Sequence, residues 1–90
     1  MDFEWDERKR LANIEKHGLD FIDAIELFET SHLTGPARTV AEEDRFLAVG
    51  LIGDVHVAAI FTHRGDTIRL ISLRRARNAE RQRYHEVFGH

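Results

Sequence analysis

Arginine carries the clearest chemical signal in this sequence, because it is concentrated in the last third of the chain. Residues 64–90 contain seven basic residues, all arginine, and three acidic ones, which gives a net charge of +4. Residues 1–63 contain six basic and 13 acidic residues and have a net charge of −7. Guanidinium presents a planar set of donors that binds phosphate or carboxylate through paired hydrogen bonds. The pattern therefore predicts a local surface for a polyanion or an acidic partner, formed by Arg64, Arg69, Arg74, Arg75, Arg77, Arg81 and Arg83.

Phosphoryl transfer is the chemistry that suits such a cluster. Fixed guanidinium groups stabilise the extra negative charge on phosphorus as the transition state forms. The competing interpretation is a solvated helix face, on which arginines form surface ion pairs with Glu80 and Glu86 that contribute less than about 1 kcal/mol each. Charge patterning alone supports both interpretations about equally.

Histidine is the second residue type of interest, since its side chain both takes and gives a proton near neutral pH. Of the six histidines, His17 ends the first expected helix, His56 and His63 lie in an expected strand, and His85 lies in the last expected helix. For any one of them a structural role is more common than catalysis. The chain has no cysteine and no HExxH motif, so the sequence does not predict a metal site.

A polar stripe on the first expected helix supplies further candidates. Lys9, Asn13 and Lys16 are spaced by four and three residues and share one side, which we expect to lie opposite the packing residues Leu11 and Ile14. The stripe suits phosphate contacts, but a solvated face has the same pattern. Asparagine is the informative member, because it disfavours helix interiors and so indicates a specific hydrogen bond.

Two aromatic residues, each the only one of its type, complete the candidates. Tyr84 suits either hydrogen bonding to phosphate and stacking on a base or packing in the core. Trp5 directly precedes an expected helix cap, where an apolar residue usually packs inward.

Two N-terminal helices are predicted ahead of any long strand. Asp6 caps a helix that runs to about His17, and Gly18 suits the left-handed conformation that ends it. Asp20 caps the second helix, whose apolar residues follow the spacing of one helix face. These residues are Phe21, Ala24, Ile25 and Phe28.

The pattern changes near Arg45 to β-branched and aromatic runs separated by short turns. Residues 45–52, 55–63 and 67–74 form an expected antiparallel meander, because such short turns permit only hairpins. Residues 32–40 form a loop or a short edge strand, a short strand piece is possible at residues 3–5, and Asn78 caps a last helix. The predicted fold is α+β, with two N-terminal helices packed on a three- to four-stranded antiparallel sheet and a C-terminal helix.

The length and composition fit a single domain, spanning residues 1–90, in a reducing compartment. Ninety residues suffice for one small core, and the absence of cysteine excludes disulfides. The first ten residues are too charged for a signal peptide, and the longest apolar run is far below the ~20 residues that span a bilayer. We therefore expect a cytoplasmic protein with no membrane partner and no cofactor.

An ordered set of segments resembles the BrnT toxins of bacterial type II toxin-antitoxin systems. The segments are FEWDERK, NIEKHGLDF with the following DAIELF, EEDRFLAVG, THRGDTIRLIS and RRARNAERQRYHE. Each is weak alone, but together they cover nearly the whole chain in the expected order. Leu73 stands where the family commonly has alanine in an ISAR segment, a change that affects packing more than chemistry.

The resemblance implies a RelE-like fold, metal-independent cleavage of RNA, and neutralisation by a BrnA-like ribbon-helix-helix antitoxin, with operator DNA bound only through that antitoxin. The alternative is a degenerate toxin-like module that only binds an antitoxin or adaptor. On this hypothesis Arg64, Arg74 and Arg81 stabilise charge, Tyr84 positions phosphate or base, and His17, which follows Lys16 in the KHG segment, transfers a proton. The expected substrate-binding residues are Lys9, Asn13, Lys16, Arg69 and Arg75.

Overall fold

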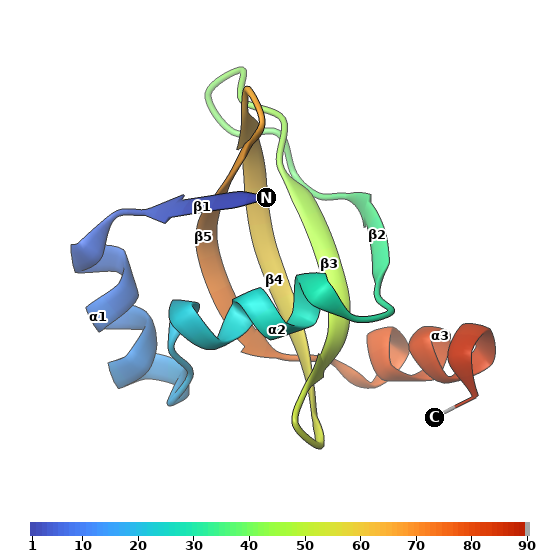
Figure 1. Ribbon diagram of the computed structural model, residues 1–90. Coiled ribbons are helices and arrows are strands. Elements are labelled where there is room, and N and C mark those ends of the chain that lie inside the picture. The colour runs from blue at the N-terminus through green and yellow to red at the C-terminus, as the bar shows by residue number, and fades with distance from the viewer. Residues whose placement is uncertain (90) are drawn as a thin grey trace.

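The fold is built on one five-stranded mixed sheet (Figure 1). A computed structural model describes residues 1–89. The strands lie in the order β1-β5-β4-β3-β2. Their bounds are β1 (Asp2–Trp5), β2 (Leu33–Pro36), β3 (Phe46–Ile52), β4 (Val55–Arg64) and β5 (Thr67–Arg75). The helices are α1 (Glu7–His17), a 3-10 turn (Phe21–Asp23), α2 (Ala24–Glu29) and α3 (Asn78–Phe88).

The predicted meander is confirmed. β3 pairs with β4 and β4 with β5, both antiparallel, and the turns between them are short. Gly53 and Gly65 occupy these turns with φ of 58° and 60°, a conformation that glycine adopts without a steric penalty. Residues 33–36 form the edge strand β2, antiparallel to β3.

The expectation of a purely antiparallel sheet of three or four strands is wrong. The short piece near the N-terminus is a fifth strand, β1, which pairs parallel to β5 from Asp2 opposite Thr67 to Trp5 opposite Leu70. Parallel neighbours need a long connection, and here residues 6–66 lie between the two strands. A strand of four residues is too short for its alternation of side chains to indicate which strand it pairs with. Here the partner is also distant in the sequence.

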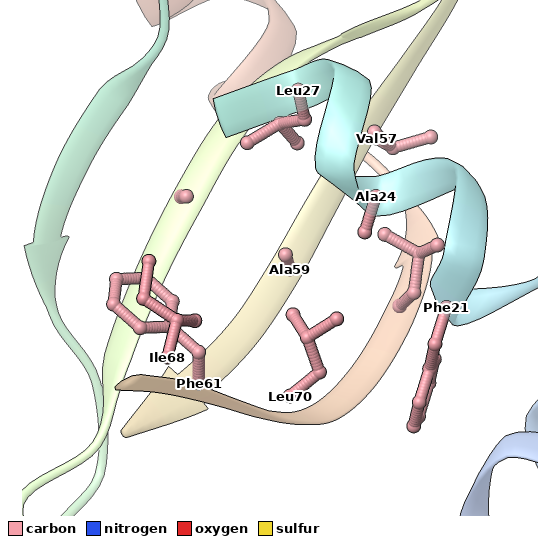
Figure 2. Packing of buried hydrophobic residues seen from close by; sticks show 10 residues of the cluster. Phe21, Ala24, Leu27, Val57, Ala59, Phe61, Ile68 and Leu70 are labelled. Carbon is pink, nitrogen blue, oxygen red and sulfur yellow. The ribbon is translucent and has the colours of Figure 1, made fainter. Parts of the chain in front are cut away.

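The main core lies between the sheet and the N-terminal helices. Phe21, Ala24 and Leu27 are fully buried against alternate residues of the strands, among them Val57 and Ala59 of β4 (Figure 2). Leu73 is also fully buried in this core, which agrees with a packing role for the residue that departs from the ISAR pattern. The second helical segment therefore packs on this face as predicted, whereas α1 contributes no buried apolar residue and is held at the edge of β5 through Asn13.

The opposite face of the sheet carries a smaller core under α3. Val49 and Ala58 are partners across β3 and β4, and they pack with Tyr84 of α3. Their neighbours in sequence, Ala48 and Ala59, belong to the main core, as the alternation of side chains along a strand requires. α3 thus lies on the face that the other helices leave open.

Three helix details differ from the sequence prediction. Leu11 is 55% exposed, so of the two residues expected to pack only Ile14 is partly buried, and it is Asn13 that is buried on the docking side of α1. Asp20 does cap the second helical segment, by accepting from the Ile22 N–H, but the segment starts as a 3-10 turn before α2. α3 begins after the N-cap residue Arg77 rather than after Asn78, because Glu80 accepts the backbone N–H of Arg77.

Candidate functional site

A bidentate ion pair between Arg74 and Glu80 fixes the start of α3 against β5. The Arg74 guanidinium donates to both carboxylate oxygens of Glu80, at 2.8 and 2.9 Å, and both side chains are less than one-fifth exposed. These hydrogen bonds, with that from the Arg77 N–H, lower the pKa of the Glu80 carboxyl and raise the pKa of Arg74. Arg74 therefore connects β5 to α3 as well as adding positive charge.

Four exposed arginines surround this junction. Arg75 ends β5, Arg77 caps α3, and Arg81 and Arg83 lie on its first turns. None of the four forms an ion pair with another residue of the described range 1–89. The N-terminus of α3 adds a partial positive charge at the same place. The junction is thus a concentrated and accessible basic surface, here named the α3 basic surface and consisting of Arg75, Arg77, Arg81 and Arg83.

Two adjoining hollows lie beside Arg81. One, of about 280 Å³, is lined by His56, Asn78, Arg81, Gln82 and His85. The other, of about 220 Å³, is lined by Asp54, Val55, His56, Arg75, Ala76 and Arg81. Because both include His56 and Arg81, these two side chains lie where the hollows meet.

Sequence reasoning did not single out His56 or His85 as site residues. They lie in different elements, 29 positions apart, so no local motif joins them. The only signal available was the four-residue spacing of Arg81 and His85, which places both on one side of a helix.

Arg64 and Arg69 lie away from α3. Arg64 is at the far end of β4, within 3.7 Å of Glu43. Ala58, the partner of Arg74, precedes it by six residues on that strand, a distance of about 20 Å at about 3.3 Å per residue. Arg69 is paired with Glu4 of β1 across the parallel strands. The predicted arginine set is therefore spread along the sheet rather than gathered at one phosphate.

Tyr84, predicted to contact substrate, lies packed between α3 and the sheet. The side chain is 2% exposed, and its ring lies 5.4 Å from that of His56 and 4.8 Å from that of Phe88. Its hydroxyl lies 3.5 Å from the Ser31 carbonyl oxygen, to which it donates. Tyr84 therefore fixes α3 on the sheet and positions His56.

Asn13, predicted to bind substrate, is buried and hydrogen-bonded to backbone groups. It is 7% exposed, and its amide donates to the carbonyl oxygens of Leu73 at 2.8 Å and Leu19 at 2.9 Å. Its side-chain oxygen accepts the Leu73 N–H at 3.0 Å. The specific hydrogen bond that its residue type indicated is confirmed, with backbone as the partner.

α1 carries the remaining candidates on the other side of the sheet from α3 (Figure 1). Lys9 and Lys16 are exposed, and His17 is partly exposed at the end of the helix. Arg10 donates to Asp20 at 2.8 and 3.1 Å, and these bonds lower the pKa of the Asp20 carboxyl. The structure does not bring His17 together with the arginines of α3.

Comparison with known families identifies the chain. Residues 5–80 match the family described as "Ribonuclease toxin, BrnT, of type II toxin-antitoxin system". The chain belongs to the BrnT family. Its family therefore places it among the ribonuclease toxins of type II toxin-antitoxin systems, for which RNA is the substrate and an antitoxin the partner.

The family match begins at the last residue of β1, covers the N-terminal helices and strands β2 to β5, and ends inside α3. Arg64, Arg69 and Arg74 of this BrnT chain are within the matched range, whereas Arg81 and His85 lie beyond it. No curated protein matches the chain. Within residues 1–89, no helix of this BrnT chain has the length and apolar character needed to cross a membrane.

Proposed function

We propose that this BrnT chain is an active endoribonuclease toxin that cleaves RNA at the α3 basic surface without a metal ion. RNA carries its own nucleophile, because the 2'-hydroxyl lies beside the phosphorus that it attacks. The protein must hold the strand in line, move two protons and stabilise charge on the nonbridging oxygens. Side chains suffice for these tasks.

The observation that carries the proposal is the concentration of unpaired guanidinium groups at the start of α3. Arg81 lies between two hollows and is exposed, so it is the proposed stabiliser of transition-state charge. Arg74 supports it from β5 while holding α3 through Glu80. Arg75, Arg77 and Arg83 bind neighbouring phosphates of the same strand.

The more distant basic residues extend the proposed RNA path. Lys9, Lys16, Arg64 and Arg69 contact phosphates further from the cleaved bond, because they lie on other elements. His17 is proposed to bind with this group rather than to transfer a proton at Arg81. Substitution of any of them should weaken RNA binding more than it lowers the cleavage rate of RNA that is already bound.

The partner is proposed to be a BrnA-like ribbon-helix-helix antitoxin that covers the α3 basic surface. An apolar hollow of about 360 Å³ adjoins this surface and is lined by Leu33, Leu47, Val49 and Arg83, among others. An acidic amphipathic segment matches both the apolar hollow and the surrounding arginines. The complex would bind operator DNA through the antitoxin, and copurification of the two chains from coexpressing cells tests the pairing.

The test of the function is cleavage of RNA by purified, antitoxin-free protein with and without EDTA. We expect cleavage under both conditions. Arg81→Ala should lower the cleavage rate by about 10²- to 10³-fold, the usual effect of removing one donor that stabilises transition-state charge. Arg38→Ala is the matched control, because Arg38 is exposed and lies in the loop between β2 and β3, away from α3. Loss of activity in EDTA with recovery in a divalent ion would contradict the proposal.

One observation favours the alternative, a module that binds its antitoxin without cleaving RNA. Arg69 and Arg74, two of the predicted site residues, are paired with Glu4 and Glu80. Growth after induction of the chain alone separates the two functions. An active toxin arrests growth and the Arg81→Ala variant does not, whereas a binding module has no effect in either form.

A further inference from the structure

We propose that His56 and His85, which line one hollow together with Arg81, are the proton-transfer pair of this ribonuclease. The inference rests on the proposed function and assigns catalytic roles to two residues that were not among the site residues predicted from the sequence. Its basis is the hollow of about 280 Å³ that both imidazoles and Arg81 line. A volume near the lower end of small-ligand sites accommodates a phosphodiester with part of a ribose.

His56 is placed by β4. Its neighbours Val55 and Val57 pack in the main core, so the alternation of the strand directs His56 to the face that α3 covers. The Tyr84 ring meets its ring nearly edge-on, with the ring planes at 82°. The side chain is only partly buried, so one end is held by packing while the hollow remains accessible.

His85 reaches the same hollow from α3. It is exposed and follows Arg81 by four residues, so the two side chains lie one turn apart on the same side of the helix. The two histidines thus come from separate elements whose relative position is fixed by the Arg74–Glu80 pair and by Tyr84.

The charged and titratable groups around His56 are mainly cationic. Asp54 contributes a carboxylate from the turn before β4, and the others come from β5 and α3. They are Arg75, Arg81, Tyr84 and His85. Two guanidinium groups against one carboxylate attract a phosphate to the point between the imidazoles.

The reaction is balanced with these groups alone. One imidazole takes the proton of the 2'-hydroxyl as its oxygen bonds to phosphorus, and the bond from phosphorus to the 5'-oxygen breaks. The other imidazole, protonated beforehand, gives its proton to the departing 5'-oxygen. The products are a 2',3'-cyclic phosphate and a 5'-hydroxyl, and Arg81 stabilises charge on the nonbridging oxygens.

The other histidines of the described residues do not offer this arrangement. His17 is on α1, across the sheet from α3. His32 has a ring nitrogen 2.7 Å from the Thr30 carbonyl oxygen and packs against Phe28. His63 packs against Phe46 and Phe61 of the main-core side.

The test compares His56→Gln and His85→Gln with wild type on two substrates. One is an ordinary RNA oligonucleotide, and the other has sulfur in place of the 5'-bridging oxygen, a leaving group that needs no proton. On ordinary RNA we expect a bell-shaped pH profile for wild type and a loss of about 10²- to 10⁴-fold in each variant. Each variant should lose a different limb of the profile. The variant that lacks the acid should recover on the sulfur substrate, and the variant that lacks the base should not.

His63→Gln is the matched control and should retain the wild-type rate. The inference is overturned if both variants keep both limbs and rates near wild type, or if neither recovers on the sulfur substrate. In either case, cleavage of RNA by the wild-type protein would still support the proposed ribonuclease function. Failure of the wild-type protein to cleave RNA would overturn both the proposed function and the roles of the two histidines. Exposed His85 tolerates substitution without loss of packing, so its result holds even if His56→Gln unfolds the protein.

Discussion

At the scale of single residues, Asn13 takes the place of a missing strand. β1 covers the edge of β5 only as far as Leu70, which leaves the Leu73 backbone groups without a strand partner on that side. Asn13 binds both the N–H and the carbonyl of Leu73 from α1. A buried backbone group left unsatisfied costs about 1–3 kcal/mol, so this one side chain protects the sheet edge and docks a helix.

Replacement of Asn13 should therefore destabilise the protein more than any change in the lysines beside it. We expect Asn13→Ala to lower the free energy of unfolding by about 2–3 kcal/mol, measured by urea denaturation. Lys16→Ala, three residues further along, should change it by less than about 0.5 kcal/mol because Lys16 is exposed. Equal stability of the two variants would contradict the role of Asn13.

The Arg74–Glu80 pair makes a second prediction at this scale, for the pH dependence of stability. Hydrogen bonding to Arg74 and the Arg77 N–H holds the pKa of Glu80 below its ordinary value of 4.5. A carboxyl with a lowered folded pKa stabilises the protein above its unfolded pKa and loses that contribution as the pH falls through the folded value.

Glu80→Gln removes this contribution. The stability difference from wild type should be largest above about pH 5 and should shrink as the pH falls toward 3, in thermal unfolding measured across that range. Glu86→Gln on the exposed side of α3 is the matched control and should have a small and constant effect. A difference for Glu80→Gln that does not vary with pH would exclude the ion pair as its cause.

At the scale of elements, the close approach of α2 to β3 depends on Gly50. A Cβ built at this position would lie 3.1 Å from both His32 Cβ and Leu27 Cγ. Gly50 faces the main core, since its partner Val57 is a member of that core. The absence of a side chain lets the end of α2 rest on the sheet.

Gly50→Ala should force that contact apart. We expect a loss of about 1–3 kcal/mol in unfolding free energy, the usual cost of adding a methyl group to a packed core. Gly35→Ala on the edge strand β2 is the matched control, because a Cβ there meets no atom within 4 Å. Denaturant midpoints that are equal for the two variants would contradict the close packing.

The helices and the meander were predictable from the sequence because their signals are local. Asp6 does cap α1 and Gly18 does end it, with φ of 70°. The parallel pairing of β1 and the burial of Asn13 depend on partners about 60 residues away, and no period in the sequence encodes them. Leu11 was wrongly predicted to pack for this reason, since the side of α1 that docks is set by the hydrogen bonds of Asn13 to the backbone.

The candidate site was predictable in composition but not in arrangement. Charge patterning located the basic third of the chain, including Arg81. It did not separate arginines held by carboxylates, such as Arg69 and Arg74, from exposed ones. Nor did it find His56, whose place beside α3 exists only after the helix crosses the second face of the sheet.

At the scale of the whole molecule, the two faces of the sheet serve different roles: one carries the main core, and the other presents the basic residues of α3. α2 covers the main core on one face, α1 is held at the β5 edge through Asn13, and α3 leaves its basic residues exposed on the other face. The negative charge of residues 1–63 opposes nonspecific binding of RNA elsewhere on the chain. The tightest RNA contacts should therefore be at α3, with weaker contacts from the basic residues of the other elements, and added salt should weaken binding steeply.

The most direct test of this account is cleavage of a matched pair of oligonucleotides in EDTA by the purified chain. One is an RNA cut at a mapped bond, and the other differs only by a 2'-deoxyribose on the 5' side of that bond. We expect the RNA to yield a 2',3'-cyclic phosphate and a 5'-hydroxyl, and the single deoxyribose to abolish cleavage at that bond. Cleavage of the deoxy-substituted bond, or no cleavage of the RNA, would contradict it.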